Sequence, residues 1–95
     1  MLTGGYMPAD TLDLGMLGER LARVRKTYGE SIDMPNLGRV AFATLLGVSA
    51  TEYVAYERGD RGPSIDFLVA LRYKTRISLD WLLDPNEPER SRPFR

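Results

Sequence analysis

Residues 45–59 read LLGVSATEYVAYERG, and this stretch decides the fold. Gly47 ends an apolar segment, because glycine adopts the left-handed conformation that closes a helix at little cost. Ser49 and Glu52 have the spacing of a capping box, in which a hydroxyl and a carboxylate satisfy free backbone amides at a helix start. We therefore expect a helix over residues 50–58. Few residues separate it from the preceding helix, which is typical of a helix-turn-helix.

Helical periodicity continues on both sides of this stretch. Apolar residues recur every three or four positions at Leu14, Leu17, Leu21, Val24 and Tyr28. The remaining predicted helices span residues 14–28, 37–46, 65–75 and 79–83. The first has Asp13 or Thr11 at its N-cap and Gly29 after its last turn. Ser64 caps the helix over 65–75, and Ser78 caps the helix over 79–83, which stops at Asp84-Pro85. Gly59 closes the helix over 50–58, and residues 30–36 (ESIDMPN) form a loop.

Length and composition predict one folded domain. The chain has 95 residues, of which 43% are hydrophobic and 27% charged. We expect a flexible N-terminal arm over residues 1–13, where Gly4, Gly5 and Pro8 interrupt any periodicity, a helix-turn-helix domain over 14–84 and a polar C-terminal tail over 85–95.

The residue types exclude several classes of function. The chain contains no cysteine and no histidine, so it lacks thiolate chemistry, the usual general base and the commonest transition-metal ligand. It also has no Gly-rich phosphate loop. We therefore expect a protein that is not an enzyme and binds no cofactor and no metal. No apolar run reaches the roughly 20 residues that span a bilayer, and residues 1–10 do not resemble a signal peptide. We expect a cytoplasmic protein with no membrane partner.

The charge balance permits binding to DNA without demanding it. The formal net charge is zero, whereas proteins that bind phosphates usually carry excess lysine and arginine. Between Leu17 and Leu83, ten basic residues face eight acidic ones. The local basic surplus is therefore weak.

Four short segments resemble the Cro/C1-type (Xre-like) repressor family. They are LLGVS at 45–49, YERG at 56–59, PS at 63–64 and SLDWLL at 78–83. They occur in the family's order and mostly at its spacing, and the resemblance covers about residues 17–84. It implies an all-α, five-helix, lambda-repressor-like DNA-binding domain whose third helix lies in the major groove.

The resemblance also assigns structural roles. It implies that Arg25 and Glu57 form a buried ion pair that links the first helix to the end of the third, and such a pair fixes orientation more than it stabilises. From the helical pattern we expect inward-facing side chains at Phe42, Ala43, Leu46, Val48 and Tyr53 on the second and third helices, at Ile65, Leu68 and Leu71 on the fourth, and at Trp81 and Leu82 on the fifth.

The DNA contacts implied by the resemblance fall into two groups. Phosphate contacts are expected from Arg39, Thr51, Arg58 and Arg61. Arg39 stands where the family usually carries a glutamine, and an arginine suits a phosphate. The positions that face the groove are Ala50, Thr51, Glu52 and Ala55.

The groove-facing positions leave a second function open. No Arg, Lys, Asn or Gln lies between Ala50 and Tyr56, although these residues make the bidentate bonds that read purines. Methyl contacts to thymine from Ala50, Ala55 or Thr51 remain, together with a bond from the Thr51 hydroxyl. Glu52 can accept from a cytosine amino group, although the capping box competes for its carboxylate.

Three departures from the family pattern concern the loop and the fourth helix. The loop over 30–36 is longer than the family needs and carries the acidic residues Glu30 and Asp33. Arg72 stands where the family usually has a small core residue, and Arg76 where it has the glycine that closes the helix. An arginine with positive φ is strained, so we expect the fourth helix to end differently here.

The sequence thus indicates a sequence-specific DNA-binding transcriptional regulator, of the repressor type, that binds double-stranded DNA as a homodimer. The last helix, with residues 79–85, and the two termini are the candidate dimer contacts. The alternative is a protein-interaction module on the same fold, antitoxin-like or a phage regulatory factor, with weak or no specific DNA binding. Salt dependence separates the two, because DNA binding releases counterions and weakens steeply as salt rises.

Overall fold

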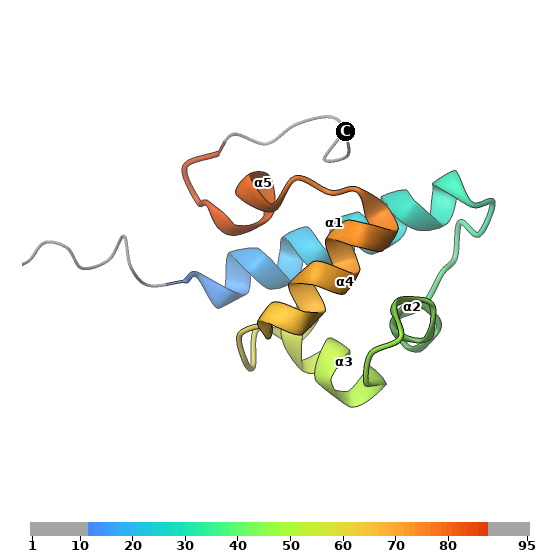
Figure 1. Cartoon of the computed structure of the whole chain (residues 1–95), viewed down its shortest axis with the longest axis horizontal. Helices are drawn as coiled ribbons and strands as arrows, with labels where there is room; N and C mark the ends of the chain where they lie inside the picture. The colour runs from blue at the N-terminus through green and yellow to red at the C-terminus, as the bar shows by residue number, and fades with distance from the viewer. Residues whose placement is uncertain (1–11, 88–95) are drawn as a thin grey trace, which may run out of the picture.

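The computed structural model describes residues 12–87, which form five helices (Figure 1). They are α1 (Leu14–Ser31), α2 (Arg39–Leu46), α3 (Ala50–Arg58), α4 (Ile65–Thr75) and α5 (Leu79–Leu83). No residue in this range belongs to an extended strand. The expected all-α, five-helix fold is confirmed. The arm predicted at 1–13 and the tail predicted at 85–95 lie mostly outside the described residues, as does Thr11, the second candidate for the first N-cap.

Side chains cap four of the five helices at their first residues. The Asp13 carboxylate accepts from the Met16 amide at 3.0 Å. The hydroxyls of Ser49, Ser64 and Ser78 accept from the amides of Glu52, Phe67 and Trp81 at 3.2, 3.0 and 3.2 Å. Each cap satisfies an amide that has no partner within its helix, which explains why the predicted starts of these four helices are correct.

The predicted end of α1 is wrong. Gly29 lies inside the helix, which continues for two more residues to Ser31, so Glu30 is helical rather than part of the loop. A Cβ on Gly29 would lie 2.5 Å from the Met34 carbonyl oxygen and 2.9 Å from Leu37 Cβ. The glycine therefore serves the close approach of the following loop. That loop buries Leu37 ahead of α2, which begins at Arg39 instead of Leu37.

The bounds of α4 are as predicted, and of its three expected inward residues Leu71 is buried and Leu68 packs partly against the core, whereas Ile65 does not. Phe67, Leu71 and Thr75 are buried, four residues apart. Positions two residues away point to the opposite side of a helix, so Ile65 is exposed rather than inward. The helix ends at Thr75, and its C-cap residue Arg76 has a left-handed φ of 62°. The expected different ending is therefore wrong: α4 closes as in the family, at a cost of about 1 kcal/mol or more for a residue with a side chain.

The core lies between α1 and the other helices, and a row of aromatic rings runs through it. Tyr28 contacts Phe42, Phe42 contacts Tyr53, Tyr53 contacts Phe67 and Phe67 contacts Tyr56, with ring centroids 4.8–5.9 Å apart. These tilted and edge-on arrangements are the favourable ones for aromatic pairs. Burial of the inward residues on α2, α3 and α5 is as predicted, with Val48 half-buried.

Arg20 on α1 holds the end of α5, a role that the sequence did not indicate. One terminal nitrogen of Arg20 donates to the carbonyl oxygens of Trp81 and, at 3.0 Å, Asp84. The other donates to the Glu87 carbonyl at 3.1 Å, and the guanidinium lies 5.0 Å from the Trp81 ring centroid. A cation at a helix C-terminus satisfies carbonyls that have no partner within the helix. These contacts fix α5 on α1.

The crossing of α1 and α3 depends on Gly18. A Cβ there would overlap the carbonyl oxygen of Glu57 and lie 2.9 Å from its carbonyl carbon, both backbone atoms of α3. We expect Gly18→Ala to lower the free energy of unfolding by about 1–3 kcal/mol, because the helices must separate. Urea denaturation followed by circular dichroism measures the change.

Gly15→Ala is the matched control for this prediction. Gly15 lies one turn earlier on α1, and a Cβ there meets nothing closer than the Asp13 carboxylate at 3.6 Å. Helix propensity then raises stability by about 0.5 kcal/mol. Equal effects of the two substitutions would show that close packing at Gly18 is not what holds α1 to α3.

Candidate nucleic-acid interface

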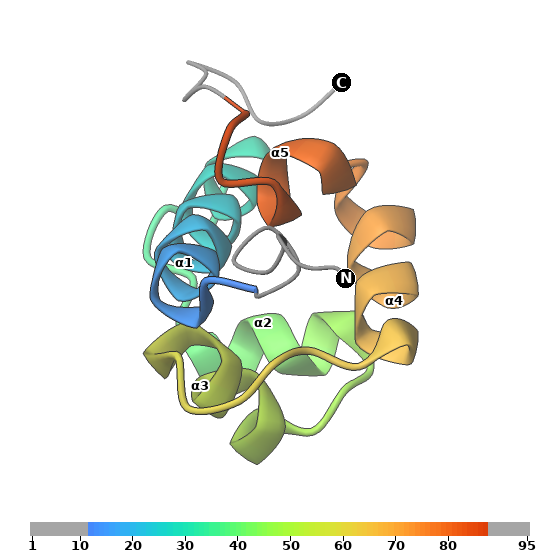
Figure 2. The same cartoon turned by 90° about the vertical axis from the view of Figure 1, so that its left-hand side faces the viewer.

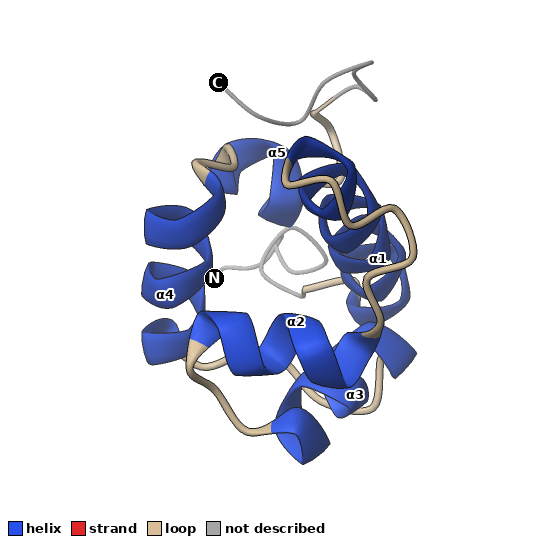
Figure 3. Ribbon diagram, turned by 90° about the vertical axis from the view of Figure 1, so that its right-hand side faces the viewer, coloured by secondary structure: helices blue, strands red, loops and turns tan. Residues whose placement is uncertain are grey.

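A tight turn joins α2 to α3 and directs one side of α3 outward. Gly47 has a φ of 74°, and the amides of Gly47 and Val48 donate to carbonyls in the last turn of α2 at 3.1 and 3.0 Å. The Phe42 and Tyr53 rings meet edge-on across the crossing at 5.4 Å. Figure 3 shows α2 and α3 together at the end of the domain away from α5. The side of α3 opposite Tyr53 therefore lies at the surface, beside Val40 of α2.

The groove-facing residues predicted from the sequence are not all equally exposed, and Ala50 packs partly against the core. Thr51 and Glu52 are exposed, and Ala50 and Ala55 are half-buried. A shallow open hollow runs along the helix, lined by Val40, Ala50, Thr51, Val54, Ala55, Arg58 and Asp60. Three of the four predicted positions, Ala50, Thr51 and Ala55, line this hollow, and Glu52 is not among its lining residues.

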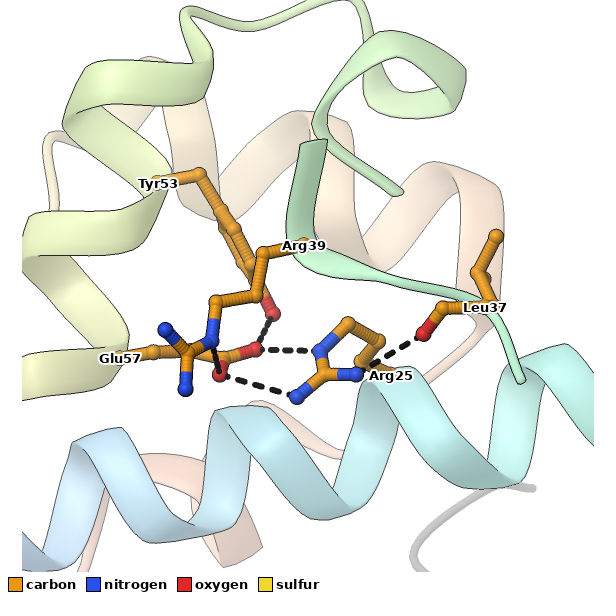
Figure 4. A network of polar contacts seen from close by, with 5 residues as sticks. All are labelled: Arg25, Leu37, Arg39, Tyr53 and Glu57. Carbon is orange, nitrogen blue, oxygen red and sulfur yellow. Dashed lines mark hydrogen bonds and ion pairs between the residues drawn. The ribbon is translucent and has the colours of Figure 1, made fainter. Parts of the chain in front are cut away.

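Glu57, at the end of α3, is the centre of a polar network (Figure 4). Its side chain is 3% exposed. Arg25 donates to both carboxylate oxygens, at 2.7 and 3.2 Å, and also to the Leu37 carbonyl at 2.8 Å. The Tyr53 hydroxyl donates to the same carboxylate. The expected buried pair of Arg25 and Glu57 is present, and it also ties down the loop before α2.

Arg39 joins the same carboxylate from α2. Its Nε lies 3.1 Å from Glu57 Oε1, and its side chain is 50% exposed. Among residues 12–87, the two terminal nitrogens of Arg39 have no hydrogen-bond partner, and Figure 4 shows them turned away from Arg25. The guanidinium is thus held by one edge, with its two remaining donors free. Sequence reasoning placed Arg39 at this surface but missed the carboxylate that orients it.

The network shifts the pKa values of two of its members. The hydrogen bond to Glu57 raises the pKa of Arg25 above its usual range, against the opposing effect of burial. Burial raises the pKa of the Tyr53 phenol strongly, and the hydrogen bond to Glu57 raises it further. Tyr53 therefore stays protonated in the folded protein well above the pH at which a free tyrosine ionises.

The other predicted contacts lie around the C-terminal and N-terminal ends of α3. Arg58 Nε lies 3.4 Å from Asp60 Oδ2 in a pair that is largely exposed, and such pairs stabilise little. Arg61 is exposed. Only half of the expected capping box forms, because within the described chain the Glu52 carboxylate makes no bond back to Ser49. That carboxylate is free at the surface.

The N-terminus of α2 differs from those of the other helices. Its N-cap is Gly38, which makes no side-chain hydrogen bond. Amides in the first turn of a helix lack partners within it, and together with the helix dipole they attract anions. These amides and Arg39 lie at the same helix end. The sequence signal for this feature was a glycine where a serine or aspartate commonly stands.

Residues 12–87 contain no group of three His, Cys, Asp or Glu side chains that could hold a metal ion. In the same range, no helix is both long and apolar enough to cross a bilayer.

Comparison with known proteins agrees with this geometry. Residues 37–82 match a family model described as Helix-turn-helix. The match runs from Leu37 to Leu82 and so includes the α2–α3 turn, the exposed side of α3 and the whole of α4. The resemblance seen in the sequence is confirmed. No curated protein and no solved structure matches the chain.

Alkaline pH tests the network around Glu57. Tyr53 is neutral in both states below its ordinary pKa of about 10; above it, the unfolded chain loses the proton and the folded chain keeps it. Stability contributed by this group is therefore complete below pH 10 and falls by about 1.4 kcal/mol per pH unit above it. Urea denaturation from pH 9 to pH 11 measures the slope.

Tyr53→Phe is the comparison protein, because it removes the ionising group and keeps the ring. Above pH 10, we expect its free energy of unfolding to fall less steeply with pH than that of the wild type. The difference in slope should be about 1.4 kcal/mol per pH unit, which corresponds to one proton. Parallel pH profiles for the two proteins would contradict the assignment of a raised pKa to Tyr53.

Proposed function

Residues 37–82 belong to the Cro/C1-type (Xre-like) helix-turn-helix family, whose fold is a DNA-binding one, and on that basis we propose that this protein is a sequence-specific transcriptional regulator. In this proposal α3 lies in the major groove of double-stranded DNA. The observation that supports it most is the open outer side of α3, with exposed arginines at both of its flanks. The opposite side of α3 packs into the core of the domain through Tyr53 and Tyr56.

The phosphate contacts are assigned to Arg39, Thr51, Arg58 and Arg61. Arg39 is the strongest of them, because Glu57 holds its Nε and leaves a two-pronged donor facing outward. A guanidinium that is already oriented loses less conformational entropy on binding a phosphate than a free one. The uncapped amides after Gly38 supply a neutral part of the same contact.

The base contacts are assigned to Ala50, Thr51, Glu52 and Ala55. Methyl groups of Ala50, Thr51 and Ala55 fit thymine methyls, and the free carboxylate of Glu52 accepts from a cytosine amino group. The absence of the second capping-box bond favours this role for Glu52, because its oxygens are not engaged by the helix. The proposed target is therefore rich in thymine contacts, and these positions lack the side chains that make bidentate bonds to purines.

The biological setting follows from the same assignment. A cytoplasmic homodimer would place two α3 helices in successive major grooves of a palindromic operator and repress by blocking the polymerase. Nothing in this scheme requires catalysis, a cofactor or a metal.

Selection from a random duplex library at two salt concentrations tests the proposal. An enriched palindrome whose recovery falls steeply with salt is the expected result. Recovery without any preferred sequence, or binding that is insensitive to salt, would overturn it and favour a protein-interaction module instead.

Substitutions separate phosphate contacts from base contacts. Arg39→Ala should weaken binding to every duplex alike and reduce the slope of log affinity against log salt by about one. Thr51→Ala should instead change the preferred sequence at one position. Fluorescence anisotropy on the selected duplex and on scrambled duplexes measures both effects.

Lys74→Ala is the charge-matched control for Arg39→Ala, because it removes one exposed positive charge from α4. It should leave the salt slope nearly unchanged. A loss as large as that of Arg39→Ala would assign the effect to net charge alone.

Gly38→Asp separates stability from binding. Gly38 is extended, with a φ of −84°, and a Cβ there meets nothing within 4 Å. An aspartate would cap α2 and raise the free energy of unfolding by roughly 0.5–1 kcal/mol. It would also place a negative charge where a phosphate is proposed, so DNA affinity should fall. A stabilised variant that binds DNA normally would remove the start of α2 from the interface.

A further inference from the structure

The outer side of α4 carries an apolar stripe that the domain does not use. Ile65, Val69 and Tyr73 are 74%, 62% and 83% exposed. Their spacing of four residues aligns them along one face of the helix, opposite the buried Phe67 and Leu71. Three large apolar side chains in a row on a small domain are typical of an interaction site.

Charges of opposite sign flank this stripe at its two ends. Asp66 lies in the first turn of α4, whereas Arg72 and Arg76 lie at its end. None of these three residues forms an ion pair with another residue of the described chain. The face is thus apolar in the middle, acidic at its start and basic at its finish.

We propose that this face binds a second copy of the same chain, with the two α4 helices antiparallel about a twofold axis at Val69. This axis brings the two Val69 side chains together and sets Ile65 level with Tyr73 of the second copy. It also brings the acidic start of each helix beside the basic end of the other, and it opposes the two helix dipoles. A symmetric contact of this kind uses the same patch twice and closes at two subunits.

The end of α5, expected from the sequence as a candidate dimer contact, fits a twofold contact less well. A hollow there is lined by Leu79, Leu83 and Pro85, but also by Asp80 and Asp84. A twofold axis through it would gather four carboxylates, which Arg20 of α1 and Arg72 of α4 lie near enough to offset in part, whereas α5 itself contains no basic residue. Like charges placed together oppose association.

The α4 face leaves the proposed DNA surface open. The hollow along α3 is lined by residues of α2, α3 and the turn after α3, and by none of α4. Figure 2 shows α4 on the side of the domain opposite α1. The α4 contact itself does not depend on the proposed function. Only its biological purpose does, because the contact would supply the homodimer that a palindromic operator requires.

The contact is small, so a weak dimer is expected. Stable interfaces bury roughly 800 Å² on each partner, more than three side chains of one helix supply. We expect a monomer–dimer equilibrium that is visible at high protein concentration and strengthened when both subunits share one duplex.

Sedimentation equilibrium of the full chain, over a roughly hundredfold range of concentration, tests the proposal. The wild type should pass from monomer to dimer, and Val69→Lys should weaken the dimer about tenfold or more. Val40→Lys is the matched control, because Val40 is a helical valine with the same 62% exposure, on α2. It should dimerise as the wild type does.

Exchange of charges provides a second variant that does not touch the apolar residues. Asp66→Arg should weaken the dimer by setting basic against basic, and the double variant Asp66→Arg/Arg72→Asp should recover it. A wild type that stays monomeric, a Val69→Lys dimer of normal strength, or equal losses in Val40→Lys and Val69→Lys would each overturn the proposal.

A half-site duplex separates failure of this inference from failure of the proposed function. Val69→Lys should bind a single half-site as the wild-type monomer does, and lose only the cooperative binding of a full site. Dimerisation through α4 without any selected duplex would uphold the inference and reject the DNA function. Normal duplex binding together with a Val69→Lys dimer of unchanged strength would uphold the DNA function and reject dimerisation through α4.

Discussion

The buried carboxylate of Glu57 is the constraint on which the rest of the domain depends. A charge this deep costs several kcal/mol unless it is paired and hydrogen-bonded, and its partners come from three helices: Arg25 from α1, Tyr53 from α3 and Arg39 from α2. The backbone of the same residue lies against Gly18 of α1. Glu57 is therefore fixed by both its side chain and its main chain, and the angle at which α3 crosses the domain follows from that double attachment.

Under the proposed function, one group thus serves both folding and recognition. The carboxylate that neutralises Arg25 in the interior also holds one edge of Arg39 at the surface. In the resembling family a glutamine usually stands at the Arg39 position, and a neutral amide would not need this support. The arginine adds a charge where phosphates are expected, and Glu57 keeps that charge from moving freely. The exposed side of α3 is poor in hydrogen-bonding groups, so accurate placement of the flanking cations matters more here than in a domain with strong base contacts.

The sequence predicted those features of the fold that depend on residues close together in the chain. Serine and aspartate caps predicted the starts of α1, α3, α4 and α5, because a cap bonds an amide only two or three residues away. Gly29 was misread because glycine serves two purposes, a left-handed ending or a close contact, and only the position of Leu37 in space distinguishes them. Ile65 was misread because α4 is apolar on two sides, so periodicity alone does not say which side is buried. The Arg20 contacts with α5 join residues more than sixty positions apart, which no local pattern reports.

The second apolar side of α4 and the zero net charge of the chain both favour the proposed pairing of two subunits. A chain with no net charge gains little long-range attraction to DNA, so in the proposed function one copy relies on a few placed arginines and a mostly methyl-bearing helix. The proposed dimer would add affinity by linking two such weak contacts, since a second site on the same duplex is reached at high effective concentration. The zero net charge also removes the overall repulsion that two copies of a strongly basic domain would feel on approach. Burial of the core does not require Ile65, Val69 and Tyr73 to be apolar, because all three point away from it. Pairing of two subunits does require an apolar face, and α4 carries it at a surface that leaves α3 free.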